Sequence, residues 1–402
     1  MNKEKIWTKG FTTITASYTL FSLGMYMLIP TIPLFLVGLG VAESQVGVVA
    51  TAFYSSSILT RFFINMVIAK AGKKRVLVVG LIINTTIMAL YSLAGSVGVV
   101  ALLRVVQGMG LGTTSAIFTT IAVDILPDSR RGQGVGYFGL GVIVAMTIGP
   151  AIALFIKDGF GFVPMFLIAG CTNMIAAVTV IFFVEEPRIN MEQQAEKQQE
   201  KPGEKAKTIQ WRNLYDRRLI LSSVIVFLFG ICRAVDTNYI ALFAMERKLE
   251  YLSWYFVIQT AAMFCIRFIM GRVADRKGRN WALIPGGFAM LALMITLNFT
   301  TTSAVMLLGA FFSGLGAGML APNLQVWILG TVEPSKRSVA SSSYYNSVDI
   351  GSAIGAPLMG LMAENFGYNS MFRTGACAAV LYLVVYITVG REKRPKGNQD
   401  AA

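Results

Sequence analysis

The chain has 402 residues, of which 55% are hydrophobic and only 14% are charged, whereas soluble domains contain about 25% charged residues. Its mean hydropathy is +0.62, which argues against a soluble globular enzyme. Histidine is absent, and this excludes imidazole acid–base chemistry, histidine metal ligands and Ser-His-Asp triads. The four cysteines form no CxxC pair, so we expect free thiols and neither a disulfide framework nor a zinc site.

Long apolar stretches recur along the whole chain, and about 20 apolar residues suffice for one transmembrane helix. The stretches fall near 12–38, 46–69, 76–95, 97–125, 134–156, 162–184, 219–245, 251–271, 281–300, 303–330, 340–363 and 370–389. They predict an all-α membrane protein with 12 transmembrane helices. The first stretch lacks a small-residue cleavage site, so we expect it to remain as a helix.

One long hydrophilic segment divides the spans into two sets of six. It contains MEQQAEKQQEKPGEKAK, a composition typical of a mobile linker. We therefore predict an N-terminal six-helix bundle over 1–185, a cytoplasmic linker over 186–218, and a C-terminal six-helix bundle with a cytoplasmic tail over 219–402.

The net charge of +14 is distributed unevenly. If both termini are cytoplasmic, the cytoplasmic segments hold 27 of the 35 lysines and arginines, and the outer loops hold three. This asymmetry follows the positive-inside rule and predicts a multi-pass protein of the cell membrane with both termini in the cytoplasm. The basic residues are then topology signals that face anionic lipid, and we expect no nucleic-acid partner.

The two halves repeat at a constant offset of 206 residues. The segment from Arg61 to Lys73 matches the segment from Arg267 to Arg279. Three glycines of the fourth span, and a basic pair after it, match positions in and after the tenth span: Gly108, Gly110 and Gly112 with Gly314, Gly316 and Gly318, and Arg130-Arg131 with Lys336-Arg337. Internal duplication with a cavity between the halves is typical of secondary transporters.

Three motifs resemble signatures of the major facilitator superfamily. Gly271 to Arg279 resembles the loop signature G-x-L-A-D-R-x-G-R, although the first copy departs from it with Asn65 and Ala69. Arg104-Val-Val-Gln107-Gly108 resembles the helix-four signature, and Gly141 to Gly149-Pro150 the helix-five signature, with Ala153 in place of its last glycine. The resemblance implies two pseudo-symmetric bundles, alternating access and proton coupling. The helix-five signature is associated with proton-coupled exporters.

The resemblance also suggests a conformational latch at the loop motif. Asp275 can accept hydrogen bonds from a neighbouring helix N-terminus, and the other latch residues are Gly271, Arg276, Gly278 and Arg279, with Asp124 as a different anion in the N-terminal half. The alternative is that the basic loops only fix topology. The chain has no GxxxxGK[ST] motif, so its glycines are better interpreted as helix-packing positions than as a phosphate loop. The helix-five motif suggests a hinge at Gly141, Gly149 and Pro150. The alternative is that these residues only shape the helix.

Charged residues within spans are costly and usually functional. Asp236 is the leading candidate for a proton carrier. Arg233 lies three residues before it, so the alternative is a permanent Arg233–Asp236 ion pair. Asp349 is a second candidate, unless it only bonds to nearby Tyr344, Tyr345 or Asn346. Arg233 and Arg104 complete the proton-coupling set, and Arg104 either influences an acid or holds a substrate anion.

In the family, helices one, four, seven and ten line the central cavity. The candidate cavity residues are Tyr18, Ser22, Met25, Tyr26, Gln107, Asn238, Tyr239, Gln259 and Asn323. The alternative for any of them is core packing or contact with lipid.

The resemblance, together with the predicted spans, implies a proton-coupled exporter of a small amphipathic molecule such as a drug, antibiotic or metabolite. The alternatives are a proton symporter that takes up a nutrient and, more remotely, a non-transporting membrane sensor. A membrane enzyme would need a catalytic cluster that the sequence does not contain. The N-terminal half lacks an acid at mid-depth, which weakens a purely cationic substrate. Substrate, protons and the bilayer are the expected partners; we expect a monomer with no cofactor and no metal.

Overall fold

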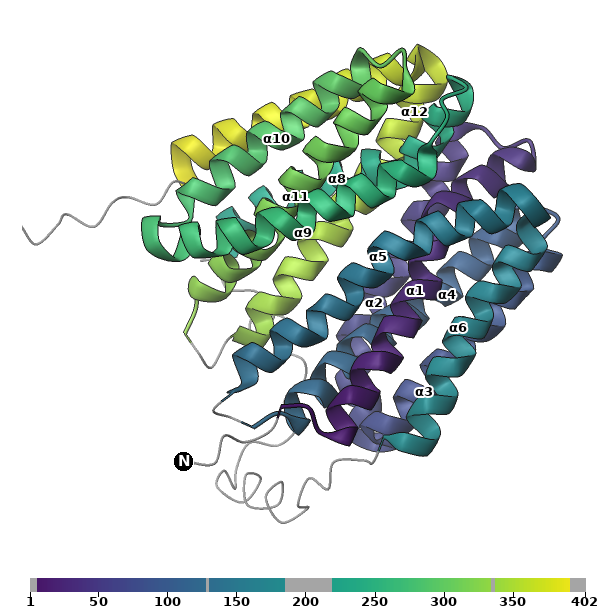
Figure 1. Cartoon of the computed structure of the whole chain (residues 1–402), viewed down its shortest axis with the longest axis vertical. Coiled ribbons are helices and arrows are strands. Elements are labelled where there is room, and N and C mark those ends of the chain that lie inside the picture. The colour runs from purple at the N-terminus through teal and green to yellow at the C-terminus, as the bar shows by residue number, and fades with distance from the viewer. Residues whose placement is uncertain (1–5, 128–129, 185–218, 334–336, 391–402) are drawn as a thin grey trace, which may run out of the picture. The chain divides into compact units, whose positions relative to one another are not determined.

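The computed structural model describes residues 6–127, 130–184, 219–333 and 337–390, and these ranges are helical (Figure 1). Apolar side chains and the need to satisfy every backbone hydrogen bond inside a bilayer favour long helices. The α-helices are α1 (Lys9–Gly38), α2 (Glu43–Ala71), α3 (Lys73–Leu90), α4 (Val97–Ile125), α5 (Arg131–Phe160), α6 (Phe162–Phe183), α8 (Ile220–Glu246), α9 (Leu252–Lys277), α10 (Asn280–Asn298), α11 (Ser303–Gly330) and α12 (Arg337–Val385). The short turns are η1 (Tyr91–Leu93) and the π-helical η6 (Tyr386–Gly390).

Eleven helices in the described ranges are long and apolar enough to cross a membrane. The last of them, α12, is not one continuous helix, because Gly367 within it has the non-helical angles φ 77° and ψ 165°. Each of the two parts is long enough to span a bilayer. The prediction of an all-α membrane protein with 12 spans is therefore confirmed, with the eleventh and twelfth spans joined in α12.

The chain divides into two compact units. The first comprises residues 1–41 and 49–216, and the second comprises 42–48 and 217–402. The predicted linker over 186–218 lies outside the described residues.

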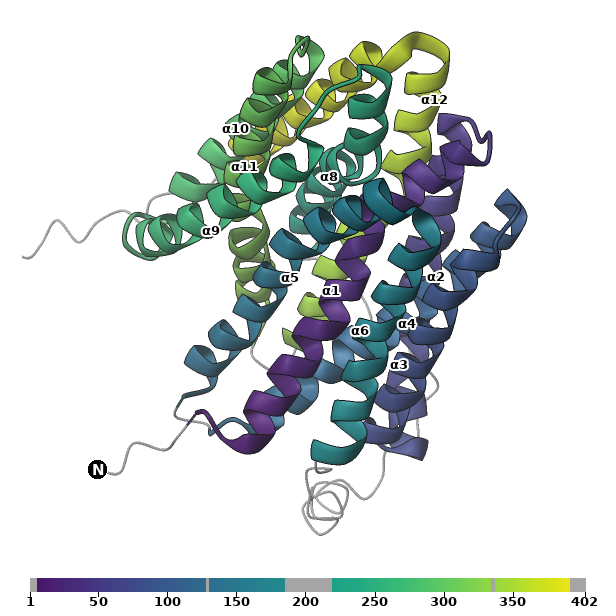
Figure 2. The ribbon, with the colours of Figure 1, turned by 45° about the vertical axis from the view of Figure 1, so that its right-hand side comes forward.

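In the first unit, α1 packs against α4, α5 and α6; Figures 1 and 2 both show α5 and α6 beside it. Its core contains an aromatic cluster in which the Tyr18 ring stacks on Phe138 with centroids 4.6 Å apart. Phe118 and Phe21 adjoin the same tyrosine ring. These contacts place Tyr18 against the packed interior of the unit.

In the second unit, α8 packs along α12, and α11 packs between α9 and α10. Phe243 of α8 contacts the part of α12 that follows Gly367. Its ring centroid lies 4.9 Å from Phe372 and 5.6 Å from Tyr368. Aromatic edge-to-face contacts of this kind add to the burial of the rings themselves.

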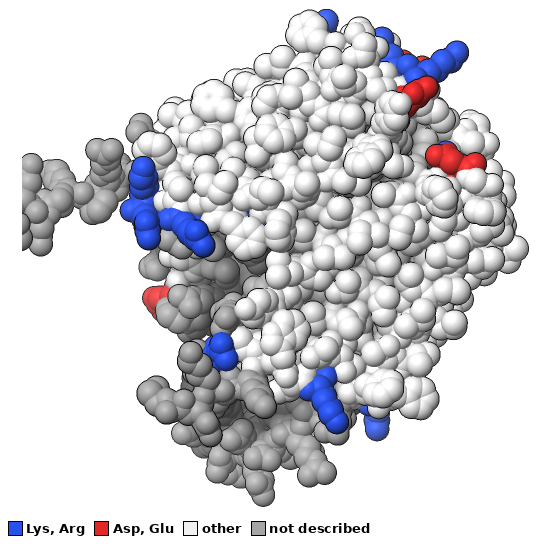
Figure 3. Space-filling model, in the orientation of Figure 1, with Lys and Arg blue, Asp and Glu red and all other residues white. Residues whose placement is uncertain are grey.

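The outward surface of the helices is apolar. Leu93, Phe155 and Phe182 are each more than 70% exposed, a pattern that is costly in water and favourable in lipid. Figure 3 shows that on the visible face the charged side chains gather near helix ends, with a broad uncharged surface between them. This distribution fits a multi-pass membrane protein.

The glycine repeat has the same structural role in both units. A Cβ on Gly108 or Gly112 would meet α2, and a Cβ on Gly110 would meet Asn84 of α3. In the second unit, Gly314 and Gly318 face α9 in the same way, and Gly316 faces Met290 of α10. The contacted residues are also offset by 206: Phe53 and Gln259, Ser57 and Met263, and Asn84 and Met290. The duplication therefore extends from sequence to helix packing.

Candidate functional site

Asp236 lies at the centre of a buried polar network in the second unit. Its side chain is 3% exposed. The Tyr255 hydroxyl donates to Oδ1 at 2.5 Å, and Oδ2 accepts from Gln259 Nε2 at 2.5 Å and from Ser313 Oγ at 2.6 Å. Gln259 also donates to Ser313 Oγ at 2.7 Å. We call Asp236, Tyr255, Gln259 and Ser313 the Asp236 network.

Three helices position this network. Tyr255 and Gln259 lie four residues apart on α9, so they share one face of that helix. Ser313 belongs to α11, which packs against both α8 and α9. Asp236 is ten residues from the C-terminal end of α8, a distance of about 15 Å along the helix. The carboxyl group is therefore well inside a membrane-spanning segment.

The alternative interpretation of Asp236 was a permanent ion pair with Arg233. No ion pair joins them in the described part of the chain, and the side chains that donate hydrogen bonds to Asp236 there are neutral. The three-residue spacing brings the two residues to neighbouring positions on α8, but the Asp236 carboxyl group bonds across to α9 and α11 instead.

The Asp236 network can accommodate two protonation states. An ionised carboxylate only accepts hydrogen bonds, and the three donors satisfy it. A protonated carboxyl group must donate one, and the Tyr255 or Ser313 hydroxyl can rotate to accept it. An ionised carboxylate in a low-dielectric region without a counter-charge is costly. The arrangement is thus chemically suited to binding and releasing a proton.

The other acid of the proton-coupling set, Asp349 on α12, is half-buried and is not among the partners of Asp236. The Tyr344 hydroxyl near it donates to the Ala321 carbonyl at 3.0 Å. Tyr345 accepts from Gln325 at 3.3 Å. The role of Asp349 in proton coupling stays a prediction.

The first unit contains a second polar network, around Gln107 of α4. Gln107 is completely buried, and its Oε1 accepts from the Tyr91 hydroxyl at 2.8 Å and from Arg104 Nη1 at 2.9 Å. Its Nε2 contacts Met25 Sδ at 3.8 Å. The Arg104 guanidinium lies over the Phe53 ring, 5.0 Å from its centroid. We call these five residues the Arg104 network.

The remaining candidate cavity residues have mixed surroundings. Tyr239 is buried and donates to the Ala356 carbonyl at 2.5 Å, which joins α8 to α12. Asn238 and Asn323 donate to carbonyls of their own helices. Ser22 is 4% exposed, and Tyr26 lies where α1 meets α5. For Tyr239 the structure favours helix packing over a cavity role.

The loop motif ends α9 at Gly278, whose φ of 91° favours glycine. Arg279 lies over Trp327 at 4.7 Å and donates to the Gly390 carbonyl at 3.3 Å. Gly271 and Arg276 are exposed, and the Asp275 side chain lies outside the described residues. A latch at this motif stays a prediction.

The N-terminal copy of the loop motif has an ion pair. Lys73 Nζ lies 2.6 Å from Asp124 Oδ2, and Lys73 corresponds to Arg279 at the repeat offset. Gly72 has φ 83°, which matches Gly278. Asp124 therefore supplies an anion beside the first loop, and the pair lies within the first unit.

The helix-five glycines face α1. A Cβ on Gly149 would lie 3.0 Å from Tyr26 Cβ and 3.1 Å from the Leu23 carbonyl, and one on Gly141 would meet Thr19. Pro150 lies inside α5. These contacts indicate close packing of two membrane helices; whether the segment acts as a hinge remains a prediction.

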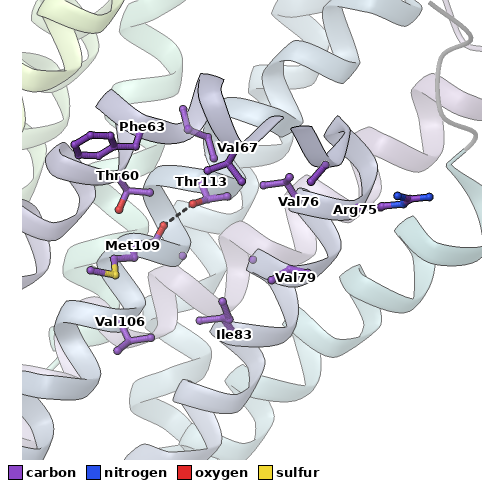
Figure 4. Close-up of a pocket in the computed structure, with 14 residues that line it drawn as sticks. Thr60, Phe63, Val67, Arg75, Val76, Val79, Ile83, Val106, Met109 and Thr113 are labelled. Carbon is purple, nitrogen blue, oxygen red and sulfur yellow. Dashed lines mark hydrogen bonds between the residues drawn. The ribbon is translucent and has the colours of Figure 1, made fainter. Parts of the chain in front are cut away.

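An apolar pocket of about 340 Å³ lies between α2, α3 and α4. Figure 4 shows Phe63, Val67, Val79 and Val106 around it, with Arg75 at its edge pointing away from them. Thr113, which also lines it, donates its hydroxyl proton to the Met109 carbonyl at 2.8 Å. This surface is suited to lipid chains and contains no member of either polar network.

Sequence reasoning did not identify Tyr255 and Ser313. Ser313 lies at the repeat offset from Gln107, and Tyr255 lies one turn before Gln259 on the same helix face. Both signals are present in the sequence, but neither residue is charged. The described residues contain no group of three or more Cys, Asp or Glu that could hold a metal ion.

A sequence profile described as Major Facilitator Superfamily matches residues 14–292 and 248–402. The chain belongs to this superfamily. The nucleoside transporter NupG has the same fold, with a TM-score of 0.75 at 12% identity, over 95% of this chain and 99% of that one. The protein is therefore a secondary transporter of the Major Facilitator Superfamily, not an enzyme.

Two superfamily members with similar sequences are named as exporters. The staphylopine export protein of Staphylococcus aureus is 22% identical over 89% of this chain and 90% of its own length. The multi-drug resistance efflux pump PmrA of Streptococcus pneumoniae is 24% identical over 88% of this chain and 89% of its own length.

Proposed function

We propose that the protein exports a small amphipathic molecule in exchange for protons, by alternating access, with both termini in the cytoplasm. The similarity to two named exporters supports the direction of transport. The charge asymmetry of the loops supports the orientation. Proton coupling rests on the buried Asp236 carboxyl group and its three hydrogen-bond donors, and this is the observation that carries the proposal.

Asp236 carries the proton in this proposal. When the site opens to the outside, the buried carboxylate takes up a proton and loses its charge, which lowers the cost of closing the site again. When the site opens to the cytoplasm, the proton leaves, and the three donors of the Asp236 network stabilise the carboxylate. Tyr255, Gln259 and Ser313 thus adjust to both states, and the substrate travels in the opposite direction.

Inside-out membrane vesicles test this function. They are acidified inside by respiration, a panel of cationic, neutral and anionic compounds is added, and internal pH is recorded. For wild type we expect at least one compound to release protons. The Asp236→Asn variant keeps the shape of the side chain but cannot exchange a proton, so we expect the release to disappear.

The matched control is Asp158→Asn, because Asp158 is an exposed acid paired with Lys157 at a helix end. We expect this variant to behave as wild type. Unchanged release in Asp236→Asn vesicles would reject Asp236 as the carrier. Proton-coupled efflux of a preloaded compound from the vesicles, with no exchange, would show uptake in cells and reject export.

A further inference from the structure

The Arg104 network places a cation inside a membrane-spanning helix. Arg104 is seven residues from the start of α4, about 10 Å along the helix. Arginine remains charged in proteins, and a charge at this depth is costly unless it is paired or faces a polar space. Its surroundings must therefore account for the charge.

The hydrogen-bonding capacity of Arg104 is largely unused. A guanidinium group has five N–H donors, and Nη1 binds Gln107 Oε1. Nε is buried with no hydrogen-bond partner in the described part of the protein. The Tyr91 hydroxyl already shares the same Gln107 oxygen. The neutral amide therefore does not saturate the guanidinium.

No carboxylate among the described residues of the first unit neutralises Arg104. Its acids there are Asp124, which pairs with Lys73 at 2.6 Å, and Asp158, which pairs with Lys157 at 2.6 Å. Both lie at helix ends. The Phe53 ring offers a cation–π contact, which is attractive but carries no net negative charge.

We propose that Arg104 binds a carboxylate of the transported molecule, so that the substrate class is amphipathic carboxylates. This inference rests on the proposed function, because it concerns the cargo of the same transporter. The planar guanidinium can bind a carboxylate with two parallel hydrogen bonds. Gln107 and Phe53 hold the side chain in place, and the adaptable Met25 adjoins Gln107.

Matched pairs of ligands test the inference on the purified full chain in lipid nanodiscs. The pairs are 2-naphthoate with 2-naphthamide, indole-3-acetate with indole-3-acetamide, and benzoate with benzamide. Thermal unfolding and titration measure binding at constant chloride. We expect at least one carboxylate to stabilise wild type more than its amide, and Arg104→Gln to weaken its binding at least tenfold.

Gln107→Glu is the sharper variant, because it keeps the side-chain shape and places a carboxylate beside Arg104. This internal counter-ion should compete with the ligand, so we expect carboxylate binding to be lost while the protein itself becomes more heat-stable. A purely structural arginine predicts no such exchange. If Arg104→Gln does not fold, as judged by its unfolding without ligand, Gln107→Glu still decides the question.

Proton exchange in vesicles separates this inference from the proposed function. The matched control for binding is Asp158→Asn, which we expect to bind the carboxylates as wild type does, because Asp158 is an exposed acid paired with Lys157. The inference is overturned if no carboxylate binds better than its amide, or if Gln107→Glu binds the carboxylate as wild type does. Carboxylate binding without proton exchange in vesicles would support Arg104 and reject the exporter.

Discussion

The Arg104 network and the Asp236 network occupy corresponding places in a duplicated scaffold. Gln107 and Ser313 are equivalent at the 206-residue offset, and so are Phe53 and Gln259. In the first unit the Phe53 ring lies under the Arg104 guanidinium; in the second, the Gln259 amide donates to the Asp236 carboxyl group. The two units thus share their helix packing and differ in the ionisable side chain that lies between the helices, an arginine in one and an aspartate in the other.

This difference shows which features of the duplication are retained. The glycines that allow helices to approach are present in both units, and their contacts correspond residue by residue. The polar side chains between those helices have diverged. Packing positions preserve the scaffold, whereas the charged positions give each unit its own chemistry.

The largest expected effect comes from breaking the shared packing. A Cβ on Gly314 would meet the Gln259 carbonyl, and one on Gly108 would meet the Phe53 carbonyl. Backbone atoms cannot move aside cheaply, so we expect Gly314→Val and Gly108→Val to lose stability near the upper end of the usual range for overpacking, about 3 kcal/mol, and much of the folded protein. The yield of monodisperse protein after detergent extraction measures this.

Gly98→Val is the control, since a Cβ on Gly98 of α4 meets nothing within 4 Å. Its yield should match wild type. Normal yields of Gly314→Val and Gly108→Val would show that the close helix approach is not needed.

Exchanging the equivalent residues gives the next largest effect. Gln259→Phe introduces the first unit's residue and removes one donor to the Asp236 carboxylate. A hydrogen bond to a charged group contributes about 1.5–3 kcal/mol, so we expect proton exchange in vesicles to fall about tenfold or more. The reverse change, Phe53→Gln, removes only the cation–π contact of Arg104 and should weaken carboxylate binding by less than about tenfold. Equal proton exchange by Gln259→Phe and wild type would contradict this comparison.

Removing single hydroxyl groups distinguishes the donors within the Asp236 network. Tyr255→Phe removes the one donor to Oδ1 found among the described residues, whereas Ser313→Ala leaves Gln259 as a donor to Oδ2. We therefore expect Tyr255→Phe to reduce the rate of proton exchange severalfold and Ser313→Ala to reduce it less. Initial rates in vesicles at matched protein levels provide the measurement, and the reverse order would contradict the assigned bonding.

The smallest effect is expected at the loop of the first unit. Lys73 and Asp124 form an ion pair whose side chains are 20% and 30% exposed, and partly exposed pairs contribute less than about 1 kcal/mol. Lys73→Gln should lower the unfolding temperature slightly and leave carboxylate binding unchanged. A large loss of transport with unchanged stability would instead indicate a latch.

Much of the fold follows from the sequence, because hydrophobic length predicts spans and the 206-residue offset predicts equivalent contacts. The site follows less completely. Spacing along α8 suggested Arg233 as the partner of Asp236, since one helix determines which residues are neighbours on it. Which residues face Asp236 depends on how α9 and α11 pack, and this brings in Tyr255 and Ser313, whose neutral side chains give little signal.

The central claim is that Asp236 itself gains and loses a proton. Infrared difference spectroscopy of the reconstituted protein can follow the C=O stretching band of a protonated carboxylic acid, using the compound that releases protons from vesicles. We predict that this compound changes the band in wild type and in Asp158→Asn, but not in Asp236→Asn. The same band change in Asp236→Asn, or no change in wild type, would contradict the account.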